Sequence, residues 1–279
     1  MDIKAIDCLI NDFSAEGIAS FGQEIIDVMK WWGMEDRLKG YTPEEFIAIM
    51  DEAGVERVVA PSMKMRSYRK GDFVIDTPWE RIADLIQKHP DRFIGLYGIN
   101  PMMRMEGVKE MEKCIKEYGF KGGYIHTYGF GIPLNHRMYY PYYAKCAELG
   151  FPVGMQTGHS AEFMPNELGR PIHLDDVAVD FPELTLIAMH MGWPWVEELI
   201  ALGWKHPNLY ICSSGHRPRY WDKSFYNFFR TRGQDKVLYG TDYPLLFHKD
   251  SLEEIMSLEV KETVIRKFLY DNAKKVFKL

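Results

Sequence analysis

An apolar run that ends in a carboxylate decides the fold: Val237-Leu238-Tyr239-Gly240-Thr241-Asp242-Tyr243-Pro244. Short apolar runs bounded by turn residues are typical of buried strands. Three other runs of this kind also end in polar side chains, which are those of His126, Gln156 and His190. The ends of parallel barrel strands meet at one rim, so the sequence predicts that these groups lie together with Asp242.

Eight short runs have strand-like composition, and segments of helical periodicity separate them. The predicted strands are residues 3–9, 57–61, 93–99, 122–126, 152–156, 185–190, 209–212 and 237–241. This alternation indicates a parallel sheet, and eight units most simply close as a (β/α)8 TIM barrel of the α/β class, a single domain over residues 1–279. The alternative is an open doubly wound sheet. Its dinucleotide-binding form needs a glycine-rich turn after the first strand, and residues 7–12 contain no glycine.

Local signals predict where several helices begin and end. Thr42-Pro43-Glu44-Glu45 and Thr77-Pro78-Trp79-Glu80 each offer a capping threonine, a proline for the first turn and a glutamate that closes a capping box. Three predicted helices end at a glycine, namely Gly54, Gly119 and Gly150. Residues 13–41 are too long for an ordinary connection and contain an amphipathic segment, so we expect a helical insertion that covers part of the barrel mouth.

Composition excludes several classes of function. The net charge is −6, and no concentrated basic face accompanies it, which argues against nucleic acid as a partner. No apolar run approaches the roughly 20 residues of a membrane span, and the first residues lack a signal pattern, so we expect a cytoplasmic protein that does not bind membranes. The four cysteines have no CxxC spacing and are predicted to be reduced, buried thiols.

The barrel prediction gathers the residues that could perform chemistry at one rim. Asp242 suits a general base or a metal ligand, and His190 suits a metal ligand, a proton donor or an electrophile that polarises a carbonyl. Two arginines after the seventh strand, Arg217 and Arg219, suit a bidentate clamp on a substrate carboxylate. The remaining candidates for substrate binding are Asn11, His126, Gln156 and His159.

Several ordered sequence blocks resemble the amidohydrolase superfamily, in the amidohydrolase-related branch that includes aminocarboxymuconate semialdehyde decarboxylase and the hydroxybenzoate and resorcylate decarboxylases. They include Ala5-Ile6-Asp7, Arg170-Pro171-Ile172-His173-Leu174, Ala188-Met189-His190-Met191-Gly192 and Gly240-Thr241-Asp242-Tyr243-Pro244. The resemblance implies a (β/α)8 barrel with one divalent metal. In that family an HxH or ExH pair after strand one, a histidine after strand five and an aspartate after strand eight hold the metal, and a histidine after strand six serves the metal or the substrate.

This chain departs from that ligand pattern at three positions. The first pair falls on Leu9 and Asn11 and the strand-five ligand on Gln156, whereas His190 and Asp242 match. Leucine cannot ligate, and neutral amides are poor zinc ligands. We therefore expect no cofactor; the alternative is one divalent metal, zinc or manganese, held weakly by His190 and Asp242.

Three functions remain open from the sequence. The first is a metal-independent, amidohydrolase-like hydrolase of a small carboxylated lactone or amide, with Asp242 as general base. The second is a decarboxylase or other lyase of a small aromatic or unsaturated acid. The third is a barrel without catalysis that binds a small molecule or a partner protein. The resemblance also implies a homodimer.

Overall fold

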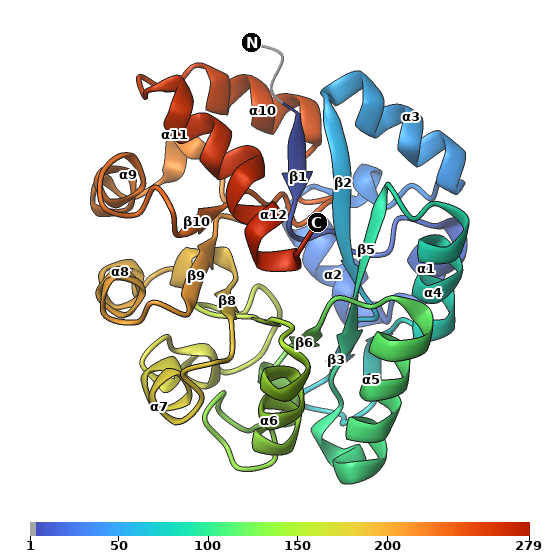
Figure 1. Ribbon diagram of the computed structural model, residues 1–279. Helices are drawn as coiled ribbons and strands as arrows, with labels where there is room; N and C mark the ends of the chain where they lie inside the picture. Colours follow the sequence, from blue (N-terminus) through green and yellow to red (C-terminus); the bar gives the residue numbers. More distant parts are fainter. Residues whose placement is uncertain (1–3) are drawn as a thin grey trace.

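The computed structural model describes residues 4–279 and contains eight parallel strands arranged around an axis (Figure 1). In spatial order they are β1 (Ala5–Asp7), β2 (Val55–Pro61), β5 (Phe93–Gly98), β6 (Gly123–Ile125), β7 (Val153–Met155), β8 (Leu186–Ala188), β9 (Leu209–Cys212) and β10 (Val237–Leu238). Backbone hydrogen bonds also join the last strand to the first, because the Cys8 amide donates to the Tyr239 carbonyl at 2.9 Å. The predicted (β/α)8 barrel is confirmed. The predicted start of the first strand at residue 3 lies outside the described residues.

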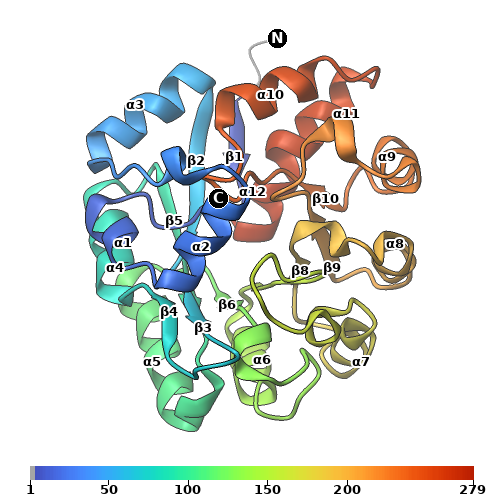
Figure 2. The ribbon, with the colours of Figure 1, turned by 180° about the vertical axis from the view of Figure 1, so that it is seen from behind.

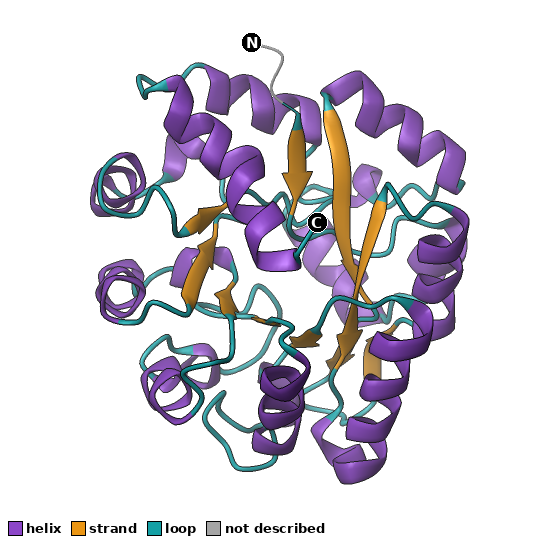
Figure 3. Ribbon diagram, in the orientation of Figure 1, coloured by secondary structure: helices purple, strands orange, loops and turns teal. Residues whose placement is uncertain are grey.

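Helices surround the strands as an outer ring (Figure 3). In chain order they are α3 (Pro43–Ala53), α4 (Trp79–Lys88), α5 (Arg104–Tyr118), α6 (Tyr140–Leu149), α7 (His173–Asp180), α8 (Val196–Lys205), α9 (Lys223–Arg230), α10 (His248–Met256) and α11 (Glu262–Arg266). Each turns an apolar face inward; α3, for example, buries Phe46 and Met50 completely. Within residues 4–279, no helix has the length and apolar character needed to cross a membrane.

Two helices outside this ring cover the ends of the barrel. The C-terminal helix α12 (Asn272–Phe277) packs Val276 and Phe277 into the same buried cluster as the barrel-interior residues Ile6 and Leu96. The helix α2 (Gln23–Trp31) lies on the opposite side of the molecule (Figure 2). It follows α1 (Ala15–Ala19), so residues 13–41 form helices that lie over the carboxyl ends of the strands. A hairpin of β3 (Lys64–Arg66) and β4 (Phe73–Asp76) packs beside α2.

Most of the predicted helix boundaries are confirmed. Thr42 and Glu45 form the full capping box of α3, and helices α3, α5 and α6 end at left-handed glycines. The prediction that Thr77 caps α4 was wrong. Thr77 is buried at the end of the hairpin, where its amide donates to the Met63 carbonyl at 2.9 Å, and α4 begins after Pro78 without a side-chain cap. The four cysteines are free and buried, as predicted.

A buried polar network fixes the segment that precedes Asp242. One carboxylate oxygen of Asp7 accepts hydrogen bonds from the amides of Leu9, at 3.1 Å, and Thr241, at 2.9 Å. The other accepts from the Thr241 hydroxyl and from His248 Nε2, the latter at 2.9 Å. Asp7 and His248 are almost completely buried. Asp7 therefore ties the first strand to the loop after the last one.

We expect Asp7→Asn to lower the free energy of unfolding by about 3–5 kcal/mol, because it leaves a buried network with one partner removed. Chemical denaturation of the variant and the parent measures this difference. The matched control is Asp250→Asn, because Asp250 is exposed on α10 and its replacement should change the stability by less than about 0.5 kcal/mol. Equal stability of Asp7→Asn and the parent would contradict the assigned role.

Candidate active site

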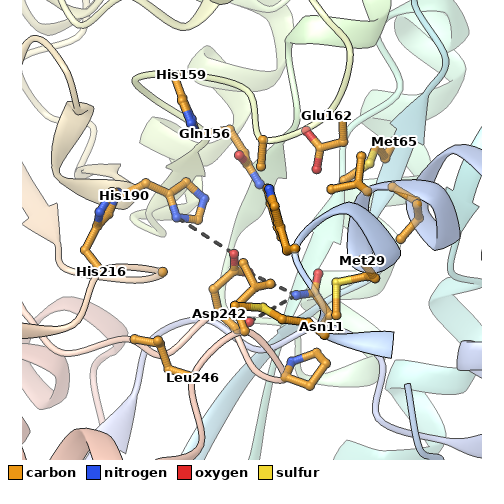
Figure 4. A pocket seen from close by; sticks show the side chains of 18 of the residues that line it. Asn11, Met29, Met65, Gln156, His159, Glu162, His190, His216, Asp242 and Leu246 are labelled. Atoms are coloured by element: carbon orange, nitrogen blue, oxygen red, sulfur yellow. Dashed lines mark hydrogen bonds and ion pairs between the residues drawn. The ribbon is translucent and has the colours of Figure 1, made fainter. Parts of the chain in front are cut away.

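A cavity of about 340 Å³ lies at the carboxyl ends of the barrel strands, and residues of the α1–α2 segment line its other side. Figure 4 shows the side chains that surround it. The cavity brings together most of the candidate residues, because the strands that carry them end at one rim. Its polar lining includes Asn11, Gln156, His159, Glu162, His190, His216, Arg217 and Asp242.

Asp242 projects its carboxyl group into this cavity from the loop after β10. Its backbone has a φ of 56°, a left-handed conformation that aspartate tolerates better than most residues. One carboxylate oxygen accepts a hydrogen bond from Asn11 Nδ2 at 2.9 Å, and the other lies 4.0 Å from His190 Nδ1. Burial raises the pKa of Asp242 to about 7, against the opposing effect of the Asn11 hydrogen bond. The group therefore exchanges a proton near neutral pH.

His190 faces Asp242 as a neutral imidazole. Burial lowers its pKa to about 4, although the hydrogen bond to the Ser214 backbone raises it in part. Its Nδ1 lies 3.1 Å from the Ser214 carbonyl, which only accepts, so Nδ1 carries the hydrogen. Nε2 then keeps its lone pair for a cation or for a substrate proton.

Two neutral amides complete the polar end of the cavity. Asn11 directs its NH2 group at Asp242 and at the Tyr243 carbonyl, 3.0 Å away. Gln156 donates from Nε2 to the Tyr124 hydroxyl at 3.0 Å. In both cases the NH2 group is engaged, which leaves the side-chain carbonyl oxygen of each amide as an acceptor or ligand.

Three predicted site residues have different surroundings. Arg217 lines the cavity, and its guanidinium contacts Glu254 at 2.7 Å. Arg219 pairs with the same carboxylate but is half exposed and does not line the cavity, so of the two arginines only Arg217 lies where it could contact a ligand in this cavity. His126 is fully buried beside the cavity and is not part of its wall. A loop after a strand does not dictate which of two nearby arginines turns inward.

Glu162 lines the cavity and was not predicted from the sequence. Its Oε2 accepts from the Ser160 hydroxyl at 2.8 Å and lies 3.7 Å from His126 Nε2. Burial alone would raise the pKa of Glu162, but His126 and Ser160 lower it to about 2. Both ring nitrogens of His126 have no hydrogen-bond partner among the described residues. The sequence feature that could have identified Glu162 is its position three residues after His159, in the loop that follows β7.

The hydrogen bond from Asn11 has a measurable consequence for Asp242. In the metal-free protein, Asn11→Leu should raise the pKa of Asp242 above about 7, because a bond that favours the ionised carboxylate is lost. NMR titration of carboxyl-labelled aspartate measures this pKa. The exposed residue Asn227 offers the control, since Asn227→Leu should leave the Asp242 titration unchanged. An unaltered titration in Asn11→Leu would contradict the assigned contact.

The fold and the cavity define a class of barrel protein with its polar site at the carboxyl ends of the strands. Residues 27–279 match the family described as Amidohydrolase, and the chain belongs to that family. It is 23% identical to gamma-resorcylate decarboxylase from Polaromonas sp. (strain JS666) over 84% of this chain and 86% of that one. The predicted resemblance to the decarboxylase branch is thereby confirmed.

Solved structures show the same fold. An uncharacterized TIM-barrel protein from Bordetella bronchiseptica superposes with a TM-score of 0.82 at 24% identity over 99% of both chains. The 5-carboxyvanillate decarboxylase from Novosphingobium aromaticivorans has a TM-score of 0.74 at 19% identity, over 99% of this chain and 96% of that one. That structure contains manganese and 4-hydroxy-3-methoxy-5-nitrobenzoic acid. The two named relatives are decarboxylases, so they support the lyase hypothesis over the hydrolase that we expected first.

The prediction of no cofactor was wrong, because structural relatives contain manganese. That prediction followed from the preferences of zinc, and zinc favours nitrogen and sulfur ligands. Manganese accepts carboxylate, carbonyl and water oxygens as ligands. Among residues 4–279, no three His, Cys, Asp or Glu side chains form a metal-binding group. Asp242 instead shares the cavity with His190, Asn11 and Gln156. Their imidazole nitrogen and amide oxygens, with the Asp242 carboxylate, are donor types that a divalent cation which keeps some of its waters accepts.

Proposed function

We propose that this chain is a lyase that decarboxylates a small aromatic or unsaturated acid in the cavity around Asp242. The observation that carries the proposal is a buried carboxyl group with a pKa of about 7 at the floor of a largely apolar cavity. Proton transfer is most effective when the pKa of the acid or base lies near the working pH. The decarboxylase relatives support the reaction class.

Decarboxylation breaks the bond between a carbon and its carboxylate. The bonding electrons stay on the carbon, which must take up one proton as carbon dioxide leaves. Asp242 and His190 would provide this proton transfer, because both face the cavity and Asp242 is near half-protonation at neutral pH. Asp242 and His190 are themselves largely buried, and this strengthens the electrostatic effect of each group on a bound acid.

Asp242 and His190, with the amide oxygens of Asn11 and Gln156, would hold a divalent cation such as manganese. When bound, the cation supplies positive charge that attracts a carboxylate and stabilises negative charge on the reacting acid. The pKa of about 7 describes Asp242 without the cation, which would compete with that proton. In the loaded protein, the carboxylate oxygen that does not contact the cation would pass a proton to the carbon. Arg217 supplies a further positive charge at the cavity wall.

A substrate screen tests the proposal. Manganese-loaded protein is incubated with a panel of aromatic and unsaturated acids, and mass spectrometry detects the decarboxylated products. A second panel of lactones and amides is run in parallel, and Asp242→Asn protein controls for contaminating enzymes. We expect turnover within the acid panel that Asp242→Asn lacks. Turnover confined to the lactone and amide panel would instead identify a hydrolase, and turnover in neither panel would favour a binding protein.

A further inference from the structure

Most of the apolar lining of the cavity comes from α2, the residues that flank it and the β3–β4 hairpin. Helix α2 and the residues around it contribute Phe21, Ile25, Val28, Met29 and Trp32, and the hairpin adds Met65. Figure 4 places Met29 and Met65 on one side of Asn11 and Asp242, and the histidines His159, His190 and His216 on the other. The cavity thus has a polar end, where chemistry is proposed, and a separate apolar arm.

The whole cavity is larger than the ring of a simple aromatic acid requires. A cavity of roughly 150 Å³ accommodates one benzene molecule. The cavity here measures about 340 Å³ in all, so a single ring seated at Asp242 does not fill it, and the apolar side chains of the arm stay uncovered. An apolar ligand would gain dispersion contacts with these side chains.

The residue types in the arm favour a ring as its occupant. Met29 and Met65 are flexible and make favourable contacts between sulfur and aromatic rings. Phe21 and Trp32 add aromatic surface that packs edge to face or offset against another ring. None of the lining residues from α2 and the hairpin is charged, so a charged substituent would lose its hydration without a partner there. The Glu162 carboxylate also lines the cavity and would repel an anionic substituent.

We propose that the acid bound at Asp242 carries a second, ring-sized apolar substituent, which occupies the arm formed by α2 and the β3–β4 hairpin. This inference rests on the proposed function for the identity of the acid group. The residues Ile25, Met29 and Met65 then determine specificity, and they do so without contacting the reacting atoms.

Isothermal titration of the manganese-loaded protein tests the proposal with benzoate, 3-phenylbenzoate and 4-phenylbenzoate as probes. We expect at least one phenyl-substituted acid to bind about tenfold or more tightly than benzoate, because the extra ring is buried among apolar side chains. Equal or weaker binding of both phenyl-substituted acids would overturn the proposal. The comparison uses the parent protein, so it does not depend on whether a variant folds.

Two variants test whether side chains of the arm cause the tighter binding of the phenyl-substituted acid. Met29→Trp should fill the space and reduce the preference for the phenyl-substituted acid several-fold, and Met65→Ala should weaken binding of the same acid by removing its contacts. The control is Met105→Trp, because Met105 is 55% exposed on α5 and away from the cavity. A preference unchanged in both cavity variants would overturn the assignment to this arm.

The same data separate this inference from the proposed function. If the two-ring acids bind more tightly but no acid in the substrate screen is decarboxylated, the proposed reaction fails and the ligand class stands. If acids are decarboxylated but benzoate binds as tightly as its phenyl derivatives, the ligand class fails and the reaction stands.

Discussion

Asp242→Asn should lower kcat for decarboxylation by about 10²–10⁴-fold, the range typical for loss of a general acid or base. The substituted amide has the same shape, and asparagine tolerates the left-handed backbone at this position, so the fold should persist. Steady-state kinetics with an acid from the substrate screen measure the effect. Asp250→Asn, on the exposed face of α10, should retain full activity. A variant at position 242 with parental kcat would remove Asp242 from the mechanism.

The same substitution should stabilise the metal-free protein above neutral pH. Folding raises the pKa of Asp242 from 3.8 to about 7, so its contribution is complete below about pH 4 and is lost as the pH rises through 7. The ionised group then costs up to about 4 kcal/mol in the folded state, and Asp242→Asn removes this penalty. The melting temperature of the variant should exceed that of the parent at pH 8, and the two should converge near pH 4. If the difference in melting temperature between variant and parent did not change with pH, the ionisation of Asp242 would not be its cause.

Removal of divalent metal is expected to lower the decarboxylation rate by at least about 10²-fold, and added manganese should restore it. The metal content of protein purified without a histidine tag is checked by plasma mass spectrometry before and after chelation. Circular dichroism controls for loss of fold during this treatment. Full activity in protein shown to be metal-free would contradict the proposed cation site.

Manganese affinity should also fall as the pH is lowered. The cation competes with the proton on Asp242, so its affinity should fall about tenfold for each pH unit below about 7 and level off above it. The low pKa of His190 keeps that ligand neutral over the same range, and it should not add a second step above about pH 4.

The fold was predictable because its signals are local. Strand and helix periods alternate through the whole chain, and glycines such as Gly54 and Gly150 mark helix ends wherever they occur. Thr77 shows the limit of such signals. Its capping pattern is present, but the Thr77 amide bonds to the Met63 carbonyl at the end of the hairpin. Helix α4 then begins after Pro78 without a side-chain cap.

The candidate site was predictable only where a residue ends a strand. Asp242, His190 and Gln156 meet at the rim because the barrel geometry requires it. Glu162 lies deep in a loop, and Arg217 and Arg219 are separated by a single residue, so their directions depend on the tertiary packing of those loops. The apolar arm depends on how α2 docks over the barrel, which helical periodicity alone does not specify. The prediction of no cofactor was wrong because the amide oxygens were judged only as zinc ligands.

The central claim is that the substrate loses its carboxylate as carbon dioxide and that Asp242 and its neighbours deliver a proton to the same carbon. The most direct measurement is the reaction of manganese-loaded protein with an acid from the screen in D2O, analysed by NMR and mass spectrometry. We predict carbon dioxide and a product with one deuterium on the carbon that lost the carboxylate, and we expect Asp242→Asn to form both at least about 10²-fold more slowly. A product that keeps its carboxylate, or one whose formation does not depend on Asp242, would contradict this account.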